Sequence, residues 1–161
     1  KKMSKSDPSE QATIYPLHLL SNQPRSRLHS QLDCGEVSRG SKVANREPVW
    51  LHPDDATSRG IAHGDVVRIY NDRGACLAGA VVTEAIRPGV IQLATGAWFD
   101  PVDPAEIGSL DKHGNPNVLT LDKGTSKLAQ CSIAQTALVE VERFDGEPPP
   151  ITAFDPPPSI P

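Results

Sequence analysis

Apolar residues in the middle of the chain come in short runs that alternate with polar residues and are separated by turns containing glycine or proline. Such runs are typical of β-strands, because successive side chains point to opposite faces of a sheet. The run at 66–70, Val-Val-Arg-Ile-Tyr, is rich in β-branched residues and is the clearest example. The runs predict strands at residues 17–21, 49–51, 66–70, 76–83, 90–94 and 136–141.

Turn residues separate these strands. Asn71-Asp72-Arg73-Gly74 predicts a hairpin, and Arg87-Pro88-Gly89 predicts another turn. A short helix is expected from His52 or Pro53 to near Gly60, because proline suits the first turn of a helix and glycine suits its end. Short strands with two or three short helices indicate a mainly β domain. We expect a small closed barrel, since closure removes exposed strand edges.

The two ends of the chain lack this pattern. Residues 1–11 are polar and charged without apolar periodicity, so we expect them to be poorly ordered. Residues 146–161 are rich in proline and predict an extended tail without packed structure of its own. The sequence therefore predicts a non-native or disordered extension at 1–14, a globular unit at 15–145 and a Pro-rich extended tail at 146–161.

One motif in residues 1–14 resembles a loop from a different class of protein. Residues 2–8, Lys-Met-Ser-Lys-Ser-Asp-Pro, resemble the KMSKS loop of class I aminoacyl-tRNA synthetases, whose lysines contact ATP phosphates. That loop works only beside a nucleotide-binding Rossmann domain, and the strand pattern predicts none. We therefore interpret the motif as part of a fused, designed or misassembled extension.

A dense polar run, residues 22–31, directly follows the first predicted strand. Its sequence is Asn-Gln-Pro-Arg-Ser-Arg-Leu-His-Ser-Gln, which holds two guanidinium groups, an imidazole, two hydroxyls and three carboxamides. Guanidinium groups match phosphate oxygens, and the other side chains match the edges of a heterocycle. The run is a candidate site for a large polyanionic ligand, and the alternative is an ordinary polar loop.

A second polar run lies far along the chain, at residues 122–130. Its Gly124-Thr125-Ser126-Lys127 segment offers a glycine for close backbone approach, two hydroxyls and an ammonium group. These groups suit a heterocycle or a phosphate. The alternative interpretation is a helix cap with a solvated lysine.

The composition of the chain argues against several kinds of site and of protein. The 161 residues allow one domain with a single core, and 37% hydrophobic with only 4% aromatic residues indicates a modest one. A net charge of -4 argues against a general nucleic-acid surface. Cys34, Cys76 and Cys131 fit no CxxC spacing, so neither a zinc site nor a disulfide framework is expected. No run approaches the ~20 apolar residues that a membrane span needs.

Several motifs occur in a fixed order between Tyr15 and Phe144, and together they resemble the C-terminal domain of one enzyme family. The motifs are Arg27-Leu28-His29-Ser30-Gln31, Arg46-Glu47-Pro48, Asn71-Asp72-Arg73-Gly74, Leu77-Ala78-Gly79-Ala80-Val81-Val82, Gly96-Ala97-Trp98-Phe99-Asp100-Pro101, Asn117-Val118-Leu119-Thr120 and Gly124-Thr125-Ser126-Lys127-Leu128-Ala129-Gln130. They look like the dimethyl sulfoxide reductase family, and most like its biotin sulfoxide, trimethylamine N-oxide and dimethyl sulfoxide reductase branch.

The resemblance implies a double-psi β-barrel that closes over a bis(molybdopterin guanine dinucleotide) molybdenum cofactor. In that family two pterin dithiolenes and a serine from an earlier domain hold the metal. This chain would then bind the organic part of the cofactor and supply neither a metal ligand nor a catalytic residue. The implied reaction is oxygen-atom transfer from an S-oxide or N-oxide, with the chemistry belonging to the cofactor.

The resemblance also implies which residues bind the cofactor. Arg27, His29, Ser30 and Gln31 match the family's loop after the first barrel strand, where the pterin and phosphate region lies. Asn117 resembles an asparagine near a pterin, where a carboxamide donates and accepts at the ring edge. The full set of expected cofactor-binding residues is Asn22, Arg25, Arg27, His29, Ser30, Gln31, Asn117, Gly124, Thr125, Ser126 and Lys127.

The implied partners are the remaining domains of a parent reductase, with no nucleic acid and no membrane span. The fragment alone is expected to be inactive. Family resemblance places such enzymes in the bacterial cytoplasm or periplasm and does not decide between them. The alternative is a free-standing double-psi barrel that binds a nucleotide or a protein partner without redox chemistry.

Overall fold

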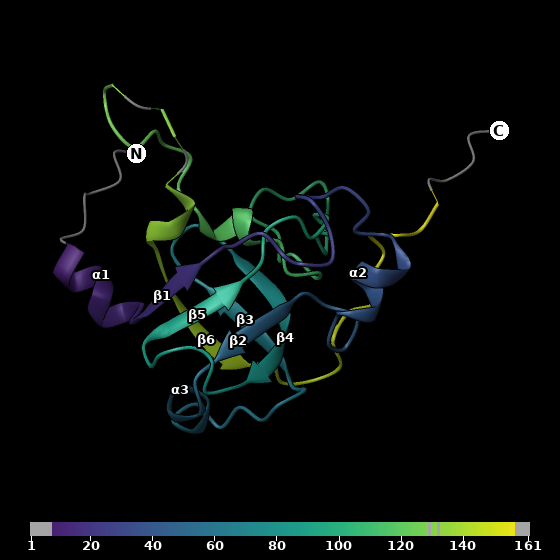
Figure 1. The fold of residues 1–161 in the computed structure, drawn as a ribbon, viewed down its shortest axis with the longest axis horizontal. Coiled ribbons are helices and arrows are strands. Elements are labelled where there is room, and N and C mark those ends of the chain that lie inside the picture. Colours follow the sequence, from purple (N-terminus) through teal and green to yellow (C-terminus); the bar gives the residue numbers. More distant parts are fainter. Residues whose placement is uncertain (1–7, 129, 132, 157–161) are drawn as a thin grey trace.

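A computed structural model describes residues 8–128, 130–131 and 133–156 (Figure 1). Each predicted strand is present, with ends that differ from the prediction by no more than two residues. The strands close into a barrel in the order β1-β5-β2-β4-β3-β6. They are β1 (Leu17–Leu20), β2 (Pro48–Leu51), β3 (Val66–Tyr70), β4 (Ala75–Val82), β5 (Val90–Leu93) and β6 (Ala137–Arg143).

Strand direction identifies the kind of barrel. β1 pairs with β5 in parallel, and β2 pairs with β4 in parallel, while the remaining neighbours are antiparallel. A closed barrel of six strands with two such parallel pairs is the double-psi β-barrel. The predicted fold class is therefore confirmed.

The core follows from the alternation in the sequence. In β3, Val67 and Ile69 are fully buried, whereas Arg68 between them lies outside. β4 departs from this rule, because its residues from Ala75 to Ala80 are buried on both faces. Its outer face is covered by other segments: Leu77 donates its N–H to Asp111 O at 2.8 Å.

The helices are short. α3 (Pro53–Thr57) is capped by His52, whose Nδ1 accepts the Asp54 N–H at 3.2 Å, and the turn after it ends at Gly60 with φ +63°. The sequence predicted this helix. The other elements are α1 (Pro8–Ile14), α2 (Glu36–Gly40), η1 (Pro116–Leu119) and η2 (Ala134–Thr136). In the described part of the chain, no helix is both long and apolar enough to cross a bilayer.

α1 differs from the expected disorder at the start of the chain. Its helix begins at Pro8, a residue that suits the first turn. The Tyr15 N–H closes the last turn on Gln11 O at 2.8 Å, and the Tyr15 ring meets the edge of Tyr70 at 6.3 Å between centroids. Residues 1–7, which hold most of the KMSKS-like motif, lie outside the described residues.

The Pro-rich tail is packed, contrary to the sequence prediction. Residues 146–156 contain no helix or strand, but they are fastened to the barrel. Arg46 Nη2 donates to Pro149 O at 2.6 Å, and Thr152 donates both its N–H and its hydroxyl to the Asp100 carboxylate, at 2.7 and 2.6 Å. The Phe154 ring packs against His113, 5.0 Å between centroids. Side-chain contacts therefore order a segment whose composition predicted none.

Replacing Gly79 with alanine should destabilise the barrel. A Cβ at position 79 would overlap the backbone carbonyl oxygen and the Cβ of Val43, so the segment that covers β4 would have to move. We expect the free energy of unfolding to fall by about 1–3 kcal/mol, as overpacking does in other cores. Chemical denaturation measures the change.

The matched control is Gly40→Ala at the end of α2, where a Cβ meets no atom within 4 Å among the described residues. We expect this variant to be as stable as the unaltered chain. Equal losses in the two variants would contradict the role assigned to Gly79.

Candidate functional site

Two loops meet at one end of the barrel because the strands before them are parallel neighbours. β1 and β5 run side by side in the same direction, so the loops that follow them leave the barrel at the same end (Figure 1). The loops are joined by a hydrogen bond from Thr95 N–H to Asn22 O at 2.9 Å. The dense polar run of the sequence therefore lies beside the loop at 94–99.

A cavity of about 410 Å³ lies where these loops meet a third segment, around η1. It brings together three of the predicted residues, His29, Ser30 and Asn117, which are far apart in sequence. The complete lining is His29, Ser30, Thr95, Gly96, Ala97, Trp98, Phe99, Asn115 and Asn117. All three predicted residues are exposed.

The polar groups of this cavity differ in their partners. Gln23 Nε2 donates a hydrogen bond to Nδ1 of the His29 ring at 2.7 Å. The Ser30 hydroxyl and the Asn117 carboxamide have no hydrogen-bond partner among the residues that the structure describes. These two groups are available to bind a ligand.

The backbone of the first loop is held in an uncommon conformation. His29 has φ 50° and Leu32 has φ 61°, values that side-chain-bearing residues rarely adopt. Gly96, with φ 95°, allows its own loop to touch the His29 carbonyl, where a Cβ would collide. Trp98 Nε1 donates to Ser30 O at 2.8 Å. Contacts from the 94–99 loop thus hold the His29-Ser30 turn in place.

Arg27 lies inside the protein beneath this turn. Its side chain is 0% exposed. Nε donates to His29 O at 3.2 Å, Nη1 to Ser38 Oγ at 3.1 Å, and Nη2 to Thr95 O at 2.9 Å. All three nitrogens have internal acceptors, so the expected direct contact of this guanidinium with a ligand does not fit the geometry. Arg27 instead ties the two loops together.

The charge of Arg27 belongs to a buried ionic cluster, which we define as Arg27, Asp33, Lys42 and Glu47. Arg27 Nη2 lies 3.1 Å from Glu47 Oε1, and Lys42 Nζ lies 2.9 Å from Asp33 Oδ1 and 3.0 Å from Glu47 Oε2. Two positive and two negative groups balance. None of these side chains is more than 2% exposed.

Asp33 connects the ionic cluster to the cavity. Its Oδ2 accepts the Trp98 N–H at 2.9 Å, and its Oδ1 accepts the Ser38 hydroxyl at 2.9 Å. Burial alone would raise the pKa of Asp33. The hydrogen bonds from Lys42 and Trp98 and the charges of Lys42 and Arg27 outweigh burial and hold that pKa below its usual value. Asp33 is therefore a charged anchor for the cavity wall.

A second buried carboxylate, Asp111, shapes the third wall of the cavity. Its Oδ1 accepts the backbone N–H groups of His113, Gly114 and Asn115 at 3.2, 2.7 and 2.8 Å. Its Oδ2 accepts the N–H of Asp100 at 2.8 Å. This fixes the turn that leads into η1 and so places the Asn117 side chain.

Sequence reasoning missed Asp33, Glu47 and Asp111. Glu47 lies in the Arg46-Glu47-Pro48 motif, and Asp33 lies among the basic residues between Arg25 and Arg46, but neither signal marks a buried ion pair. Asp111 had none, since its partners are backbone groups that only the folded chain brings together.

The other predicted residues lie elsewhere. Asn22 and Arg25 line a neighbouring groove, and Gln31 is exposed. Residues 124–127 belong to an exposed loop that projects from the barrel (Figure 1). Gly124, Thr125, Ser126 and Lys127 are absent from the lining of the His29 cavity, as far as the described residues show.

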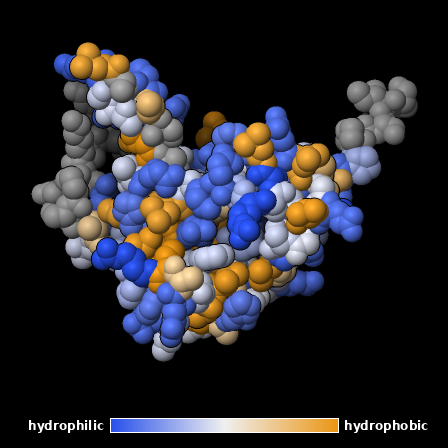
Figure 2. All heavy atoms as spheres, viewed as in Figure 1, coloured by the Kyte–Doolittle hydropathy of each residue, from blue (hydrophilic) through white to orange (hydrophobic). Residues whose placement is uncertain are grey.

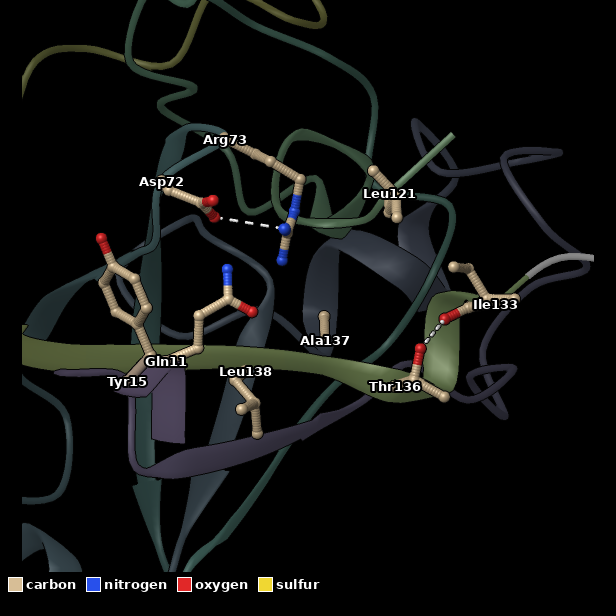
Figure 3. A pocket seen from close by; sticks show the side chains of 9 residues that line it. All are labelled: Gln11, Tyr15, Asp72, Arg73, Leu121, Ile133, Thr136, Ala137 and Leu138. Atoms are coloured by element: carbon tan, nitrogen blue, oxygen red, sulfur yellow. Dashed lines mark hydrogen bonds and ion pairs between the residues drawn. The ribbon is translucent and has the colours of Figure 1, made fainter. Parts of the chain in front are cut away.

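A smaller cavity of about 220 Å³ lies beside α1 and the start of β6 (Figure 3). Its charged groups already have partners within the protein. Arg73 Nη1 pairs with Asp72 Oδ1 at 3.1 Å, and Arg73 Nε donates to Leu119 O at 2.9 Å. The described residues contain no cluster of three or more possible metal ligands at this or any other place. We assign no chemistry to this cavity.

Comparisons with known proteins show the family to which the chain belongs. The family model of the molybdopterin dinucleotide binding domain matches residues 17–138. The dimethyl sulfoxide/trimethylamine N-oxide reductase of Cereibacter sphaeroides is 52% identical over 143 residues, which cover 89% of this chain and 17% of the relative. Trimethylamine-N-oxide reductase 1 of Escherichia coli strain K12 is 55% identical over 133 residues, covering 82% of this chain and 16% of the relative.

The chain thus spans about one sixth of the length of these curated relatives. Among solved structures, acetylene hydratase from Pelobacter acetylenicus superposes with a TM-score of 0.67 at 18% sequence identity. The match covers 84% of this chain and 19% of that chain. This likeness shows a shared fold.

Removing the charge of Asp33 should destabilise the protein strongly. Asp33→Asn leaves two buried cations facing one carboxylate, and breaking a buried ion pair in this way costs about 3–5 kcal/mol. Denaturant unfolding measures the loss. Asp145→Asn is the control, because Asp145 is 85% exposed where it pairs with Arg143, and we expect a change below about 1 kcal/mol. An Asp33→Asn variant as stable as the control would refute the anchoring role.

The stability difference between the unaltered chain and Asp33→Asn should also depend on pH. Because the folded-state pKa of Asp33 is depressed, its contribution is present above the unfolded pKa of about 3.9 and is lost as pH falls through the folded pKa. The two curves of unfolding free energy against pH should converge in acid. Curves that stay parallel down to the acid-unfolded state would show that Asp33 is not held ionised.

Proposed function

Because this chain belongs to the molybdopterin dinucleotide binding domain family, we propose that it binds the organic part of a bis(molybdopterin guanine dinucleotide) molybdenum cofactor within a larger S-oxide or N-oxide reductase. The observation that carries the proposal is the cavity at His29, where loops from three parts of the chain converge. The cofactor, when bound, supplies the oxygen-atom transfer chemistry.

The residues at the cavity fit such a ligand. The Ser30 hydroxyl and the Asn117 carboxamide have both donors and acceptors, which a pterin edge requires. The turn at His29 and the close approach of Gly96 leave backbone and side-chain groups exposed on one surface. Gln31 extends this exposed surface along the first loop. We infer that these residues bind and orient the pterin.

The buried residues act indirectly in this proposal. Arg27 and Asp33 hold the two loops, and Asp111 holds the turn before Asn117. Their charges are satisfied internally, so they are positioning residues. Within the cavity, the cofactor contacts would come from neutral side chains placed by buried charges.

The loop at 124–127 lies outside the cavity, and its proposed contact with the cofactor requires the other domains of the parent enzyme. We propose that Gly124, Thr125, Ser126 and Lys127 contact the cofactor when the rest of the parent enzyme is present. The exposure of Thr125, Ser126 and Lys127 and the ammonium group of Lys127 support this contact with an anionic ligand. The metal ligand, the substrate funnel and the oxide substrate would belong to other domains, and the isolated chain would have no reductase activity.

The test is cofactor content in a full-length reductase that carries this domain. Ser30→Ala combined with Asn117→Ala removes two neutral hydrogen-bonding groups, each worth about 0.5–1.5 kcal/mol. We expect the purified variant to hold less molybdenum and less pterin, and its occupancy to recover when free cofactor is added in excess.

Ser58→Ala provides the control, because Ser58 follows α3 at the other end of the barrel and its hydroxyl bonds only to local groups, Asp55 O among them (Figure 1). It should keep full cofactor content. If the double variant also keeps full content and releases cofactor no faster than the control, the proposed site is wrong.

A further inference from the structure

The outer wall of the barrel carries a row of three residues, two of them apolar, close to the proposed cofactor site. Leu20 of β1 lies opposite Gln92 of β5, and Gln92 lies opposite Trp50 of β2. Residues in register on neighbouring strands point to the same face, so these three side chains form one line across the outside. Leu20 is 36% and Trp50 is 37% exposed. Figure 2 shows hydrophobic side chains gathered over this wall.

A groove of about 290 Å³ lies along this row. Its floor includes Trp50, Pro24, Pro48 and Ala94, which are apolar, together with the carboxamide of Gln92. Arg25 lies at the edge and is exposed, with no hydrogen bond or ion pair to any other residue that the structure describes. The groove thus combines an apolar floor with one unpaired cation.

We propose that this groove docks a segment of the parent reductase that lies outside this chain. The segment places an apolar side chain against Trp50 and a carboxylate beside Arg25. The inference rests on the proposed function, which makes the chain one domain of a larger enzyme. It assigns Arg25 to contact between domains, although the sequence had suggested contact with the cofactor.

Three observations select a protein segment as the occupant. The curated relatives are about six times as long as the matched region, so most of such an enzyme lies elsewhere. An apolar groove on an outer strand face with a polar edge is typical of a protein contact. The carboxylate expected at Arg25 follows from charge complementarity, because Glu47, the acidic group lining the groove, is already paired with Lys42.

Docking in this groove would also support the cofactor loop. Asn22 lines the groove, and its carbonyl accepts the N–H of Thr95, which lines the His29 cavity. The two sites therefore share the base of one loop. A segment seated in the groove would restrict that loop on the side away from the cofactor.

The two tryptophans of the chain report separately on the two sites. Trp50 lines the groove and Trp98 lines the cavity. Hydroxyl-radical oxidation, read by mass spectrometry, would be compared in this chain alone, in the cofactor-free full-length reductase and in the cofactor-loaded reductase. We expect Trp50 to be several-fold less reactive in both full-length forms than in the chain alone. Trp98 should gain protection only when cofactor is loaded.

Two results would overturn the docking inference. Equal Trp50 reactivity in the chain alone and in the cofactor-free enzyme would show that no protein segment covers the groove. Protection of Trp50 only in the loaded enzyme would show that the cofactor fills it. Failure of the proposed function would give a different result. Trp98 would then react equally with and without cofactor, while Trp50 stayed protected in both full-length forms.

A charge reversal tests the predicted carboxylate entirely within the full-length enzyme, so the result does not depend on how the isolated chain folds. Arg25→Glu should raise Trp50 reactivity several-fold by placing two negative groups together. Arg87→Glu is the matched control, since Arg87 is an exposed arginine in the turn before β5 and does not line the groove. Unchanged Trp50 protection in Arg25→Glu would refute the proposed pairing.

Discussion

The arrangement of the site depends on the buried ionic cluster of Arg27, Asp33, Lys42 and Glu47. Its charges balance, and each would be costly if its partner moved away. The cluster therefore favours one relative placement of the segments that carry it: the loop after β1, the stretch after α2 and the entry to β2. Asp33 and Arg27 extend this restraint to the 94–99 loop through the Trp98 N–H and the Thr95 carbonyl.

In this organisation the buried charged groups are different from the groups that face the cavity. Ionised groups lie in the interior, where they set loop positions, and the groups that face the cavity at Ser30 and Asn117 are neutral. Neutral donors and acceptors discriminate ligands by the pattern at a heterocycle edge, whereas buried charges supply a rigid frame. A frame of this kind reduces the entropy that ligand binding would otherwise cost in loop ordering.

The sequence predicted the strands well because alternation and turn residues are local signals. Motif resemblance singled out His29, Ser30 and Asn117, which the fold brings to one cavity, and their binding of a cofactor stays a prediction. The sequence-based prediction failed for features that depend on tertiary contacts. The role of Arg27 depends on acceptors at Ser38, Glu47 and Thr95, and no local pattern marks an arginine as buried. α1 was missed because its composition is polar. The ordering of the tail was missed because proline content describes a segment's own propensity and not what it packs against.

The attachment of the tail has a consequence for any shortened version of the chain. A boundary drawn by composition falls near residue 145, just after β6, and leaves a complete barrel. Phe154 nevertheless packs on Trp98 and His113, and Thr152 bonds to Asp100 and Lys112. These partners lie directly behind the cavity wall. A fusion or truncation made at residue 145 would keep every strand but remove the contacts that Thr152 and Phe154 make at and behind the cavity wall.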